Sequence, residues 1–388
     1  MFSITTFSEL MKGLPRGTFD QLVNRHNADK YCKKFGHWDH LIAMVYGQLS
    51  GSTGLRPLVA GFNSHTAHHY HLGTGSIKRA TLADANEKRS DLVFGKVANW
   101  LMGQVSRAIR KEGKELMFLL DSTSVTLKGR QFDRWTVVNR TRNTQGLKLH
   151  MLLDALNETP AWSHFSAANV NDVELARQVP LTKDALYVFD KGYCDYNWWH
   201  LIDSAGARFV TRFKSNAALL PVEENVIPEN TQGTVLSDRV VQFKSRQAGG
   251  RANLYKKPLR CVAIVRPDKG TPLVLATNDM TSSALDIAQR YKERWAIELF
   301  FKWIKQHLRI KTFFGRSENA VRIQILAALI SYLLVALYKQ RHALQESLWE
   351  CLCVISATLF QRKKTEASWH RRRQEERRIT TQIQPCLF

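Results

Sequence analysis

Four polar side chains in the segment YKERWAIELFFKWIKQHL follow a helical spacing. They are Tyr291, Arg294, Glu298 and Lys305. Neighbours along this series are 3, 4 and 7 residues apart, which at about 100° per residue places all four within roughly 60° on one face of a helix. The opposite side of the helix is apolar and carries Ala296, Ile297, Phe300, Trp303 and Ile304. A guanidinium can make bidentate contacts with phosphate, whereas an ammonium group contacts phosphate as a point charge. The stripe therefore predicts a helix face that looks into a site and not into solvent.

Two further carboxylates end short apolar runs. Asp121 closes LMFLLD and Asp190 closes ALYVFD, and runs of that length and composition are typical of buried strands. Taken singly, each aspartate is an ordinary turn or capping residue. Glu298 alone could be half of an i,i+4 pair with Arg294 or Lys302, worth about 0.2–0.5 kcal/mol. The occurrence of all three together, in this order along the chain, favours a shared site.

These residues carry a resemblance to a known family. Tyr-x2-Arg-x3-Glu-x6-Lys is the signature of the insertion-sequence-4 family of DDE transposases, and it stands intact from Tyr291 to Lys305. LLDST around Asp121 and FDKGY around Asp190 fall where that resemblance requires the two aspartates. The segment that ends in ATLADANEKR resembles the helical domain that precedes the catalytic core in one branch of the family. The resemblance covers roughly residues 5–360.

The resemblance implies a divalent-metal site built from three distant carboxylates. Asp121, Asp190 and Glu298 would hold two Mg²⁺ ions, with Mn²⁺ able to substitute, about 3.5–4 Å apart. Mg²⁺ prefers hard oxygen ligands and keeps positions for water and phosphate, so three carboxylates suffice. In the family the remaining signature residues hold DNA phosphate near the cleaved end. The resemblance implies that Tyr291, Arg294 and Lys305 hold DNA phosphate in this chain.

The resemblance also implies a cut-and-paste reaction through a hairpin intermediate. The partners would be DNA, as terminal inverted repeats and as target, and a second copy of the chain in a synaptic homodimer. Two alternatives stay open. One is a related metal-dependent nuclease or an inactive transposase copy, and the other is a non-catalytic DNA-binding protein. A non-catalytic DNA-binding protein would not need Glu298, whereas a transposase and a nuclease would both need it.

The charge balance points to the same class of partner. The chain carries 56 Lys+Arg against 34 Asp+Glu, a formal net charge of +22, which indicates a polyanionic partner. Nucleic acid is favoured over a membrane surface. The mean hydropathy is −0.29, and the longest apolar run, from Ile325 to Tyr338, is shorter than the roughly 18 residues needed to span a bilayer. Six scattered cysteines without a CxxC motif and no visible secretory signal favour a reducing bacterial cytoplasm, with nucleoid association when bound to DNA.

The elements predict an α/β protein. We expect a ribonuclease-H-like mixed sheet flanked by helices, with a β-rich insertion before the last catalytic helix and an N-terminal all-helical domain. The helical pattern that carries the stripe should resume at Ser282 and run past Leu308, and a second long helix should run from the Ser317 cap to near Arg341. The expected parts are 1–92 (helical, DNA-binding), 93–215 with 279–345 (catalytic core), 216–278 (β insertion) and 346–388 (C-terminal helix and basic tail).

A cluster of four histidines lies in the N-terminal part: His65, His68, His69 and His71. No cysteine or carboxylate stands close to it in the sequence, which disfavours a metal site. A DNA-facing or solvated loop is the favoured interpretation.

Overall fold

The computed structural model describes residues 4–110, 115–139, 144–231, 233–244, 252–266, 270–308 and 312–362. The chain divides into two compact units, one of residues 1–101 together with 312–388 and one of residues 102–311. The basic tail expected beyond residue 362 lies outside the described residues.

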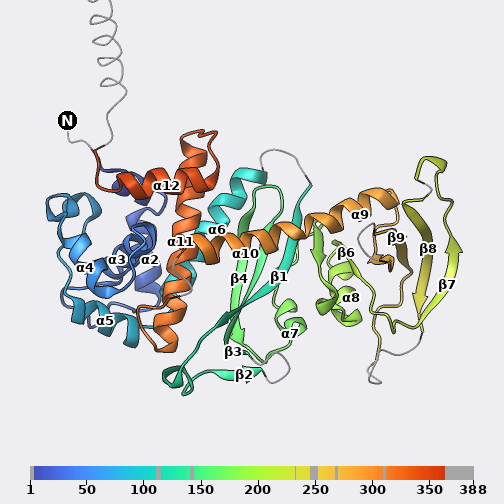
Figure 1. Cartoon of the computed structure of the whole chain (residues 1–388), viewed down its shortest axis with the longest axis horizontal. Coiled ribbons are helices and arrows are strands. Elements are labelled where there is room, and N and C mark those ends of the chain that lie inside the picture. The colour runs from blue at the N-terminus through green and yellow to red at the C-terminus, as the bar shows by residue number, and fades with distance from the viewer. Residues whose placement is uncertain are drawn as a thin grey trace, which may run out of the picture. The chain divides into compact units, whose positions relative to one another are not determined.

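Helices make up the first unit (Figure 1). They are α1 (Thr6–Met11), α2 (Arg16–Arg25), α3 (His37–Leu49), α4 (Leu55–Asn63), the 3-10 helix η1 (Thr66–Leu72), α5 (Arg79–Lys88), the first half of α6 (Leu92–Arg110), α11 (Glu318–Arg341) and α12 (Leu348–Thr358). The centre of this unit is the packing of α11 on α3, with α1, α5 and α12 around it. Twelve of the thirteen residues of α3 are buried, which agrees with its all-round apolar sequence.

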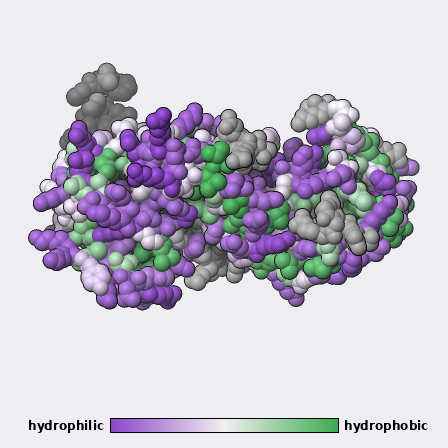
Figure 2. Space-filling model, turned by 90° about the horizontal axis from the view of Figure 1, so that it is seen from below, coloured by the Kyte–Doolittle hydropathy of each residue, from purple (hydrophilic) through white to green (hydrophobic). Residues whose placement is uncertain are grey.

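The long helix expected from Ser317 to Arg341 is confirmed. The Ser317 side chain accepts a hydrogen bond from the Ala320 amide and begins the helix. By length and composition α11 is apolar enough to cross a membrane, so the expectation that its apolar run is too short was wrong. However, 94% of its most apolar window is buried inside the fold, so it packs as a core helix. Hydrophilic residues predominate on the face drawn in Figure 2, and hydrophobic ones occur there in small patches.

A single mixed sheet forms the second unit. Its strands are β1 (Met117–Thr126), β2 (Val137–Asn139), β3 (Thr144–Asp154), β4 (Thr159–Ala167), β5 (Leu186–Phe189), β6 (Arg208–Arg212), β7 (Leu219–Glu224), β8 (Val235–Phe243), β9 (Leu259–Ile264) and β10 (Leu273–Thr277). The order is β2-β3-β1-β5-β6-β10-β9-β8-β7, with β4 also paired to β3. Strand β5 runs parallel to both of its neighbours, β1 and β6. The other pairs of neighbouring strands are antiparallel. This confirms the expected mixed α/β fold of ribonuclease-H-like type.

The β-rich insertion is confirmed, and it continues the main sheet. Strand β10 pairs with β6, and β9, β8 and β7 follow outward in antiparallel order. Helix α8 (Tyr196–Ser204) packs against β6, with Trp198 and Trp199 fully buried in a core that also contains Phe189 and Phe209. Burial of such large aromatic side chains is a main source of stability in a unit of this kind.

The helix that carries the signature is divided in two. Helix α9 (Ala284–Glu293) starts at a capping box between Ser283 and Asp286, and α10 (Trp295–His307) follows directly after Arg294. Around Arg294 the backbone hydrogen bonds span three residues instead of four. The Arg294 amide donates to the Tyr291 carbonyl oxygen, and the Ile297 amide donates to the Arg294 carbonyl oxygen. The helical pattern expected from Ser282 past Leu308 is therefore present from Ala284 to His307, with one tight 3-10 turn between the halves. The two halves run end to end across the sheet (Figure 1).

Candidate active site

Strand pairing brings Asp121 and Asp190 side by side. The parallel pairing of β1 with β5 ends at Leu120 and Phe189. Asp121 directly follows Leu120, and Asp190 directly follows Phe189. Asp190 follows the end of β5, as expected. Asp121 was also expected at a strand end, but it lies within β1, because β3 continues to pair with β1 from Asp121 to Thr126.

Glu298 enters the same neighbourhood from the first turn of α10, the helix that packs on β1. Its proximity shows in the electrostatics of Asp121. The pKa of Asp121 is raised to about 6: burial is the largest cause and the negative charges of Glu298 and Asp190 add to it, whereas the Ser122 amide and Arg294 act in the opposite direction. The structure thus brings the three predicted carboxylates into one electrostatic cluster.

Arg294 lies between two of these carboxylates. Its Nη1 atom is 2.6 Å from Oε1 of Glu298 and 4.0 Å from Oδ2 of Asp121. The guanidinium carbon also lies 5.7 Å from the ring centroids of both Tyr291 and Trp295. These contacts hold a cation at the centre of the acidic cluster.

The other two signature residues also reach the site. The Tyr291 hydroxyl donates to Oδ1 of Asp190 at 3.4 Å, and the ring is 8% exposed. Lys305 donates from Nζ to Oγ1 of Thr123 at 2.5 Å. Thr123 is two residues after Asp121 and so lies on the same face of β1. The helical spacing therefore brought all four signature side chains to one side of the sheet.

The donor set suits a hard divalent cation. Asp121, Asp190 and Glu298 offer carboxylate oxygens and no sulfur or nitrogen, the combination that Mg²⁺ and Mn²⁺ prefer. Their oxygens are not all within 4.8 Å of one another. In the described ranges the one set of three His, Cys, Asp or Glu residues that meets this limit is Asp29, Cys32 and His37.

That second set lies in the helical unit beside a cation. Arg89 donates to the Cys32 sulfur at 3.3 Å and to the carbonyl oxygen of Gly36 at 2.9 Å. His37 Nδ1 is 2.5 Å from Oδ1 of Asp29. A guanidinium at the sulfur disfavours a metal ion there by like-charge repulsion, so we assign this set to the structure of the helical unit.

The histidine cluster packs against phenylalanines. The His65 ring stacks on Phe360 and the His69 ring on Phe62, each with centroids 4.2 Å apart. His69 is buried, and its Nε2 is 3.0 Å from the carbonyl oxygen of Phe62. The prediction of a solvated loop is therefore wrong for His69, whose side chain packs η1 against Phe62.

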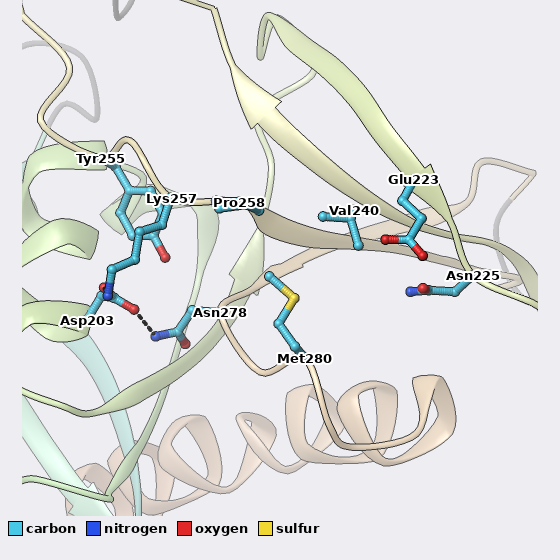
Figure 3. Close-up of a pocket in the computed structure, with 9 residues that line it drawn as sticks. All are labelled: Asp203, Glu223, Asn225, Val240, Tyr255, Lys257, Pro258, Asn278 and Met280. Atoms are coloured by element: carbon cyan, nitrogen blue, oxygen red, sulfur yellow. Dashed lines mark hydrogen bonds and ion pairs between the residues drawn. The ribbon is translucent and has the colours of Figure 1, made fainter.

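A cleft of about 510 Å³ is lined by residues of the β insertion together with Asp203 of α8 and Met280 (Figure 3). Lys257 and Asn278 both contact Asp203 at its edge, at 2.7 and 3.0 Å. Met280 and Val240 line its other side. None of the six predicted site residues lines this cleft, so it is separate from the candidate active site.

Comparison with known proteins decides the family. A family model described as "Transposase DDE domain" matches residues 112–334, which include all six predicted site residues. The chain belongs to this family. A second model, "Domain of unknown function (DUF4372)", matches residues 3–75 of this DDE-family chain. The sequence-based resemblance to insertion-sequence DDE transposases is thereby confirmed.

Curated relatives agree with this membership. The chain is 38% identical over 288 residues to "Putative transposase y4zB" of Sinorhizobium fredii, covering 74% of this chain and 78% of the relative. It is 28% identical over 270 residues to "Probable transposase for insertion sequence element IS5377" of Geobacillus stearothermophilus, with 68% and 69% covered. It is 25% identical over 264 residues to "Putative transposase for insertion sequence element IS4SA" of Synechocystis, with 66% and 71% covered.

A solved piggyBac transposase synaptic complex with hairpin DNA resembles the chain more distantly. The match covers 95% of this chain and 80% of that one, at 11% identity and a TM-score of 0.43. A likeness at this level does not extend to the details of the site.

Proposed function

We propose that this chain is the transposase of an insertion sequence, which binds terminal inverted repeats and catalyses DNA cleavage and strand transfer by cut-and-paste, through a hairpin on the element end. The observation that carries the proposal is the convergence of the signature residues on the acidic cluster. Tyr291 contacts Asp190, and Arg294 contacts both Glu298 and Asp121.

The three carboxylates would be the metal ligands. Asp121, which follows the residue paired with the end of β5 and shares Arg294 with Glu298, would hold two cations, and Asp190 and Glu298 would each complete one site. A bound pair of Mg²⁺ or Mn²⁺ ions supplies activation of the attacking oxygen and stabilisation of the leaving oxygen in phosphodiester attack. The carboxylates need no covalent intermediate with DNA for this chemistry.

The cationic signature residues would position the DNA strand. Arg294 lies beside the carboxylates, where its guanidinium can turn from Glu298 to a phosphate oxygen with bidentate geometry. Lys305 would add a point charge along the same face of β1. The phenol of Tyr291 would donate a hydrogen bond next to Asp190. The excess of cations in the chain, a net charge of +22, supports DNA as the partner.

Domain roles follow the same proposal. The N-terminal helices, residues 1–92, would recognise the inverted repeats, and two copies of the chain would pair the two ends of the element. The catalytic core would comprise residues 93–215 and 279–345, interrupted by the insertion 216–278.

The first test is cleavage of inverted-repeat DNA in Mg²⁺ by the parent chain and by Glu298→Gln. We expect the variant to lose cleavage by at least about 10²-fold, because the loss of a carboxylate removes a ligand from a site in which the charge of the cations stabilises the transition state. The matched control is Glu293→Gln, an exposed carboxylate five residues earlier, which should cut like the parent.

The same assay separates the alternatives. Equal cleavage by parent and Glu298→Gln would contradict the catalytic role. DNA binding without any cleavage by the parent would favour a DNA-binding protein or an inactive copy. Cleavage without joining of the cut end into plasmid DNA would favour a nuclease, whereas joining supports a transposase.

A further inference from the structure

A buried lysine lies behind the candidate active site, on β3. Lys148 is 4% exposed, and lysines are almost never buried unless they are paired. Its Nζ atom donates to Oδ1 of Asp172 at 3.0 Å and to the carbonyl oxygen of Val170 at 2.6 Å. Lys148 lies opposite Ser124 on β1, so this ion pair is within one strand of the segment that carries Asp121.

The same carboxylate oxygen connects directly to that segment. The Ser122 hydroxyl donates to Oδ1 of Asp172 at 3.0 Å, and the Ser122 amide donates to Oδ1 of Asp121 at 2.8 Å. Asp172 thus accepts hydrogen bonds from Lys148 and from the residue that supports Asp121. A change in the position of Asp172 would be transmitted to Asp121 through a single residue.

His150 is the other basic group that faces Asp172 from β3, with Nδ1 at 3.9 Å from Oδ1. The pKa of His150 is lowered to about 4, mainly by burial and also by the charges of Lys148 and His164, against the opposite effect of Asp172. The imidazole is therefore neutral near pH 7, and its Nε2 pairs with the hydroxyl of Ser166 at 2.8 Å. The counter-charge of Asp172 in this buried network is thus Lys148.

A second arm of the network reaches Asp190. Asp172 is the first residue of α7 (Asp172–Ala176), which packs on the 3-10 helix η3 (Lys191–Tyr193). That helix begins directly after Asp190. Tyr193 is 2% exposed. Burial raises the pKa of this phenol, and the negative charges of Asp121, Asp172 and Asp190 raise it further, whereas Ser122 lowers it.

We infer that the Lys148–Asp172 ion pair is a positioning unit for the reaction: it sets the relative positions of Asp121, through Ser122, and of Asp190, through α7 and η3. This inference rests on the proposed function. A buried ion pair contributes little net stability compared with apolar residues of the same size, so stability alone does not account for it. Partners behind metal ligands orient them, and their loss typically weakens metal binding about 10- to 100-fold.

The test is Mn²⁺ binding by the full-length chain without DNA, measured by calorimetry and by the electron paramagnetic resonance of free Mn²⁺. The variant is Lys148→Met combined with Asp172→Asn, which removes both charges and keeps an oxygen for Ser122. We expect Mn²⁺ to bind at least about 10-fold more weakly, while binding of inverted-repeat DNA in EDTA stays as in the parent.

The matched control is a second buried ion pair in the same unit. Arg260 and Asp238 pair at 2.6 Å between β9 and β8, with side chains 8% and 6% exposed. Arg260→Met with Asp238→Asn makes the same change of charge in the insertion and should leave Mn²⁺ affinity unchanged. The inference is overturned if the two double variants bind Mn²⁺ equally well.

A smaller change keeps the test valid if the double variant does not fold. Ser122→Ala removes the hydroxyl that connects Asp172 to the Asp121 segment, and Ser122→Thr retains a hydroxyl at that position. We expect weaker Mn²⁺ binding for Ser122→Ala and recovery for Ser122→Thr. Equal affinity of all three proteins would contradict the positioning role.

Failure of the inference differs from failure of the proposed function. If Glu298→Gln abolishes cleavage while the Lys148/Asp172 variant binds Mn²⁺ like the parent, only the positioning role is lost. If Glu298→Gln cuts like the parent, the proposed function is lost, whatever Mn²⁺ affinity the ion-pair variant shows.

Discussion

Arg294 contacts two candidate metal ligands at once, so its loss should separate metal binding from DNA positioning. In Arg294→Ala we expect Mn²⁺ to bind at least as tightly as in the parent, because the cation that competes for Glu298 and Asp121 is removed. Hairpin formation on pre-cleaved inverted-repeat ends should fall about 10²-fold, because a charge-assisted phosphate contact is lost.

Lys305→Ala should show the same pattern with a smaller loss, since a point charge orients phosphate less strictly than a guanidinium. Lys302→Ala, an exposed lysine on the same helix, is the control and should form hairpins normally. Unchanged hairpin formation in both Arg294→Ala and Lys305→Ala would remove their assigned role.

Single residues were predictable where a local period fixes them. The helical spacing identified Tyr291, Arg294 and Glu298, and the structure brings them to Asp121 and Asp190 as that spacing requires. The contact between Lys148 and Asp172 could not be predicted from a local period. It depends on the register of β3 against β1 and on the path of the chain between β4 and α7. A lysine inside an apolar strand was the one available signal.

At the scale of elements, α9 is anchored by a buried carboxylate. The Asp279 side chain is 0% exposed and pairs with Arg290 of α9 at 2.9 Å and with Arg208 of β6 at 3.3 Å. Burial raises the pKa of Asp279, but hydrogen bonds from Ser282 and Thr281 outweigh it and hold the pKa well below the ordinary value of 3.8. The helix that presents Tyr291 is thereby attached to the sheet.

This anchor predicts an acid-sensitive contribution to stability. Because the pKa of Asp279 is lowered in the folded state, its contribution is present above the ordinary pKa and is lost as the pH falls below about 4 toward the lowered value. Asp279→Asn should lower the free energy of unfolding at pH 7 by about 2–3 kcal/mol and reduce the loss of stability below pH 4. Urea unfolding at pH 7 and at about pH 3.5 measures both effects.

The exposed carboxylate of Glu293, changed to Gln, is the control for that experiment. It should unfold like the parent at both pH values. An Asp279→Asn variant as stable as the parent at pH 7 would show that the two arginines do not depend on this carboxylate.

The elements were predictable in type but not in all their limits. The predicted cap at Ser317 starts α11, because a side-chain oxygen on a helix amide is a local signal, whereas α9 starts after a cap at Ser283, one residue later than expected. The turn at Arg294 lacks such a signal, since neither glycine nor proline stands there. The continuation of the sheet through β10 and β6 is a non-local pairing, which strand composition alone does not determine.

At the scale of the whole molecule, the net charge of +22 predicts steeply salt-dependent DNA binding. Each phosphate neutralised by Lys or Arg releases condensed counterions, which gives a slope of about −0.9 in log affinity against log salt. With roughly six to ten such contacts, affinity for inverted-repeat DNA should fall about 10³- to 10⁵-fold between 50 and 200 mM salt. Fluorescence anisotropy in EDTA with Glu298→Gln measures this without cleavage during the titration. An affinity that hardly changes with salt would mean that phosphate contacts do not account for the excess of cations, and that the partner is held mainly by uncharged groups.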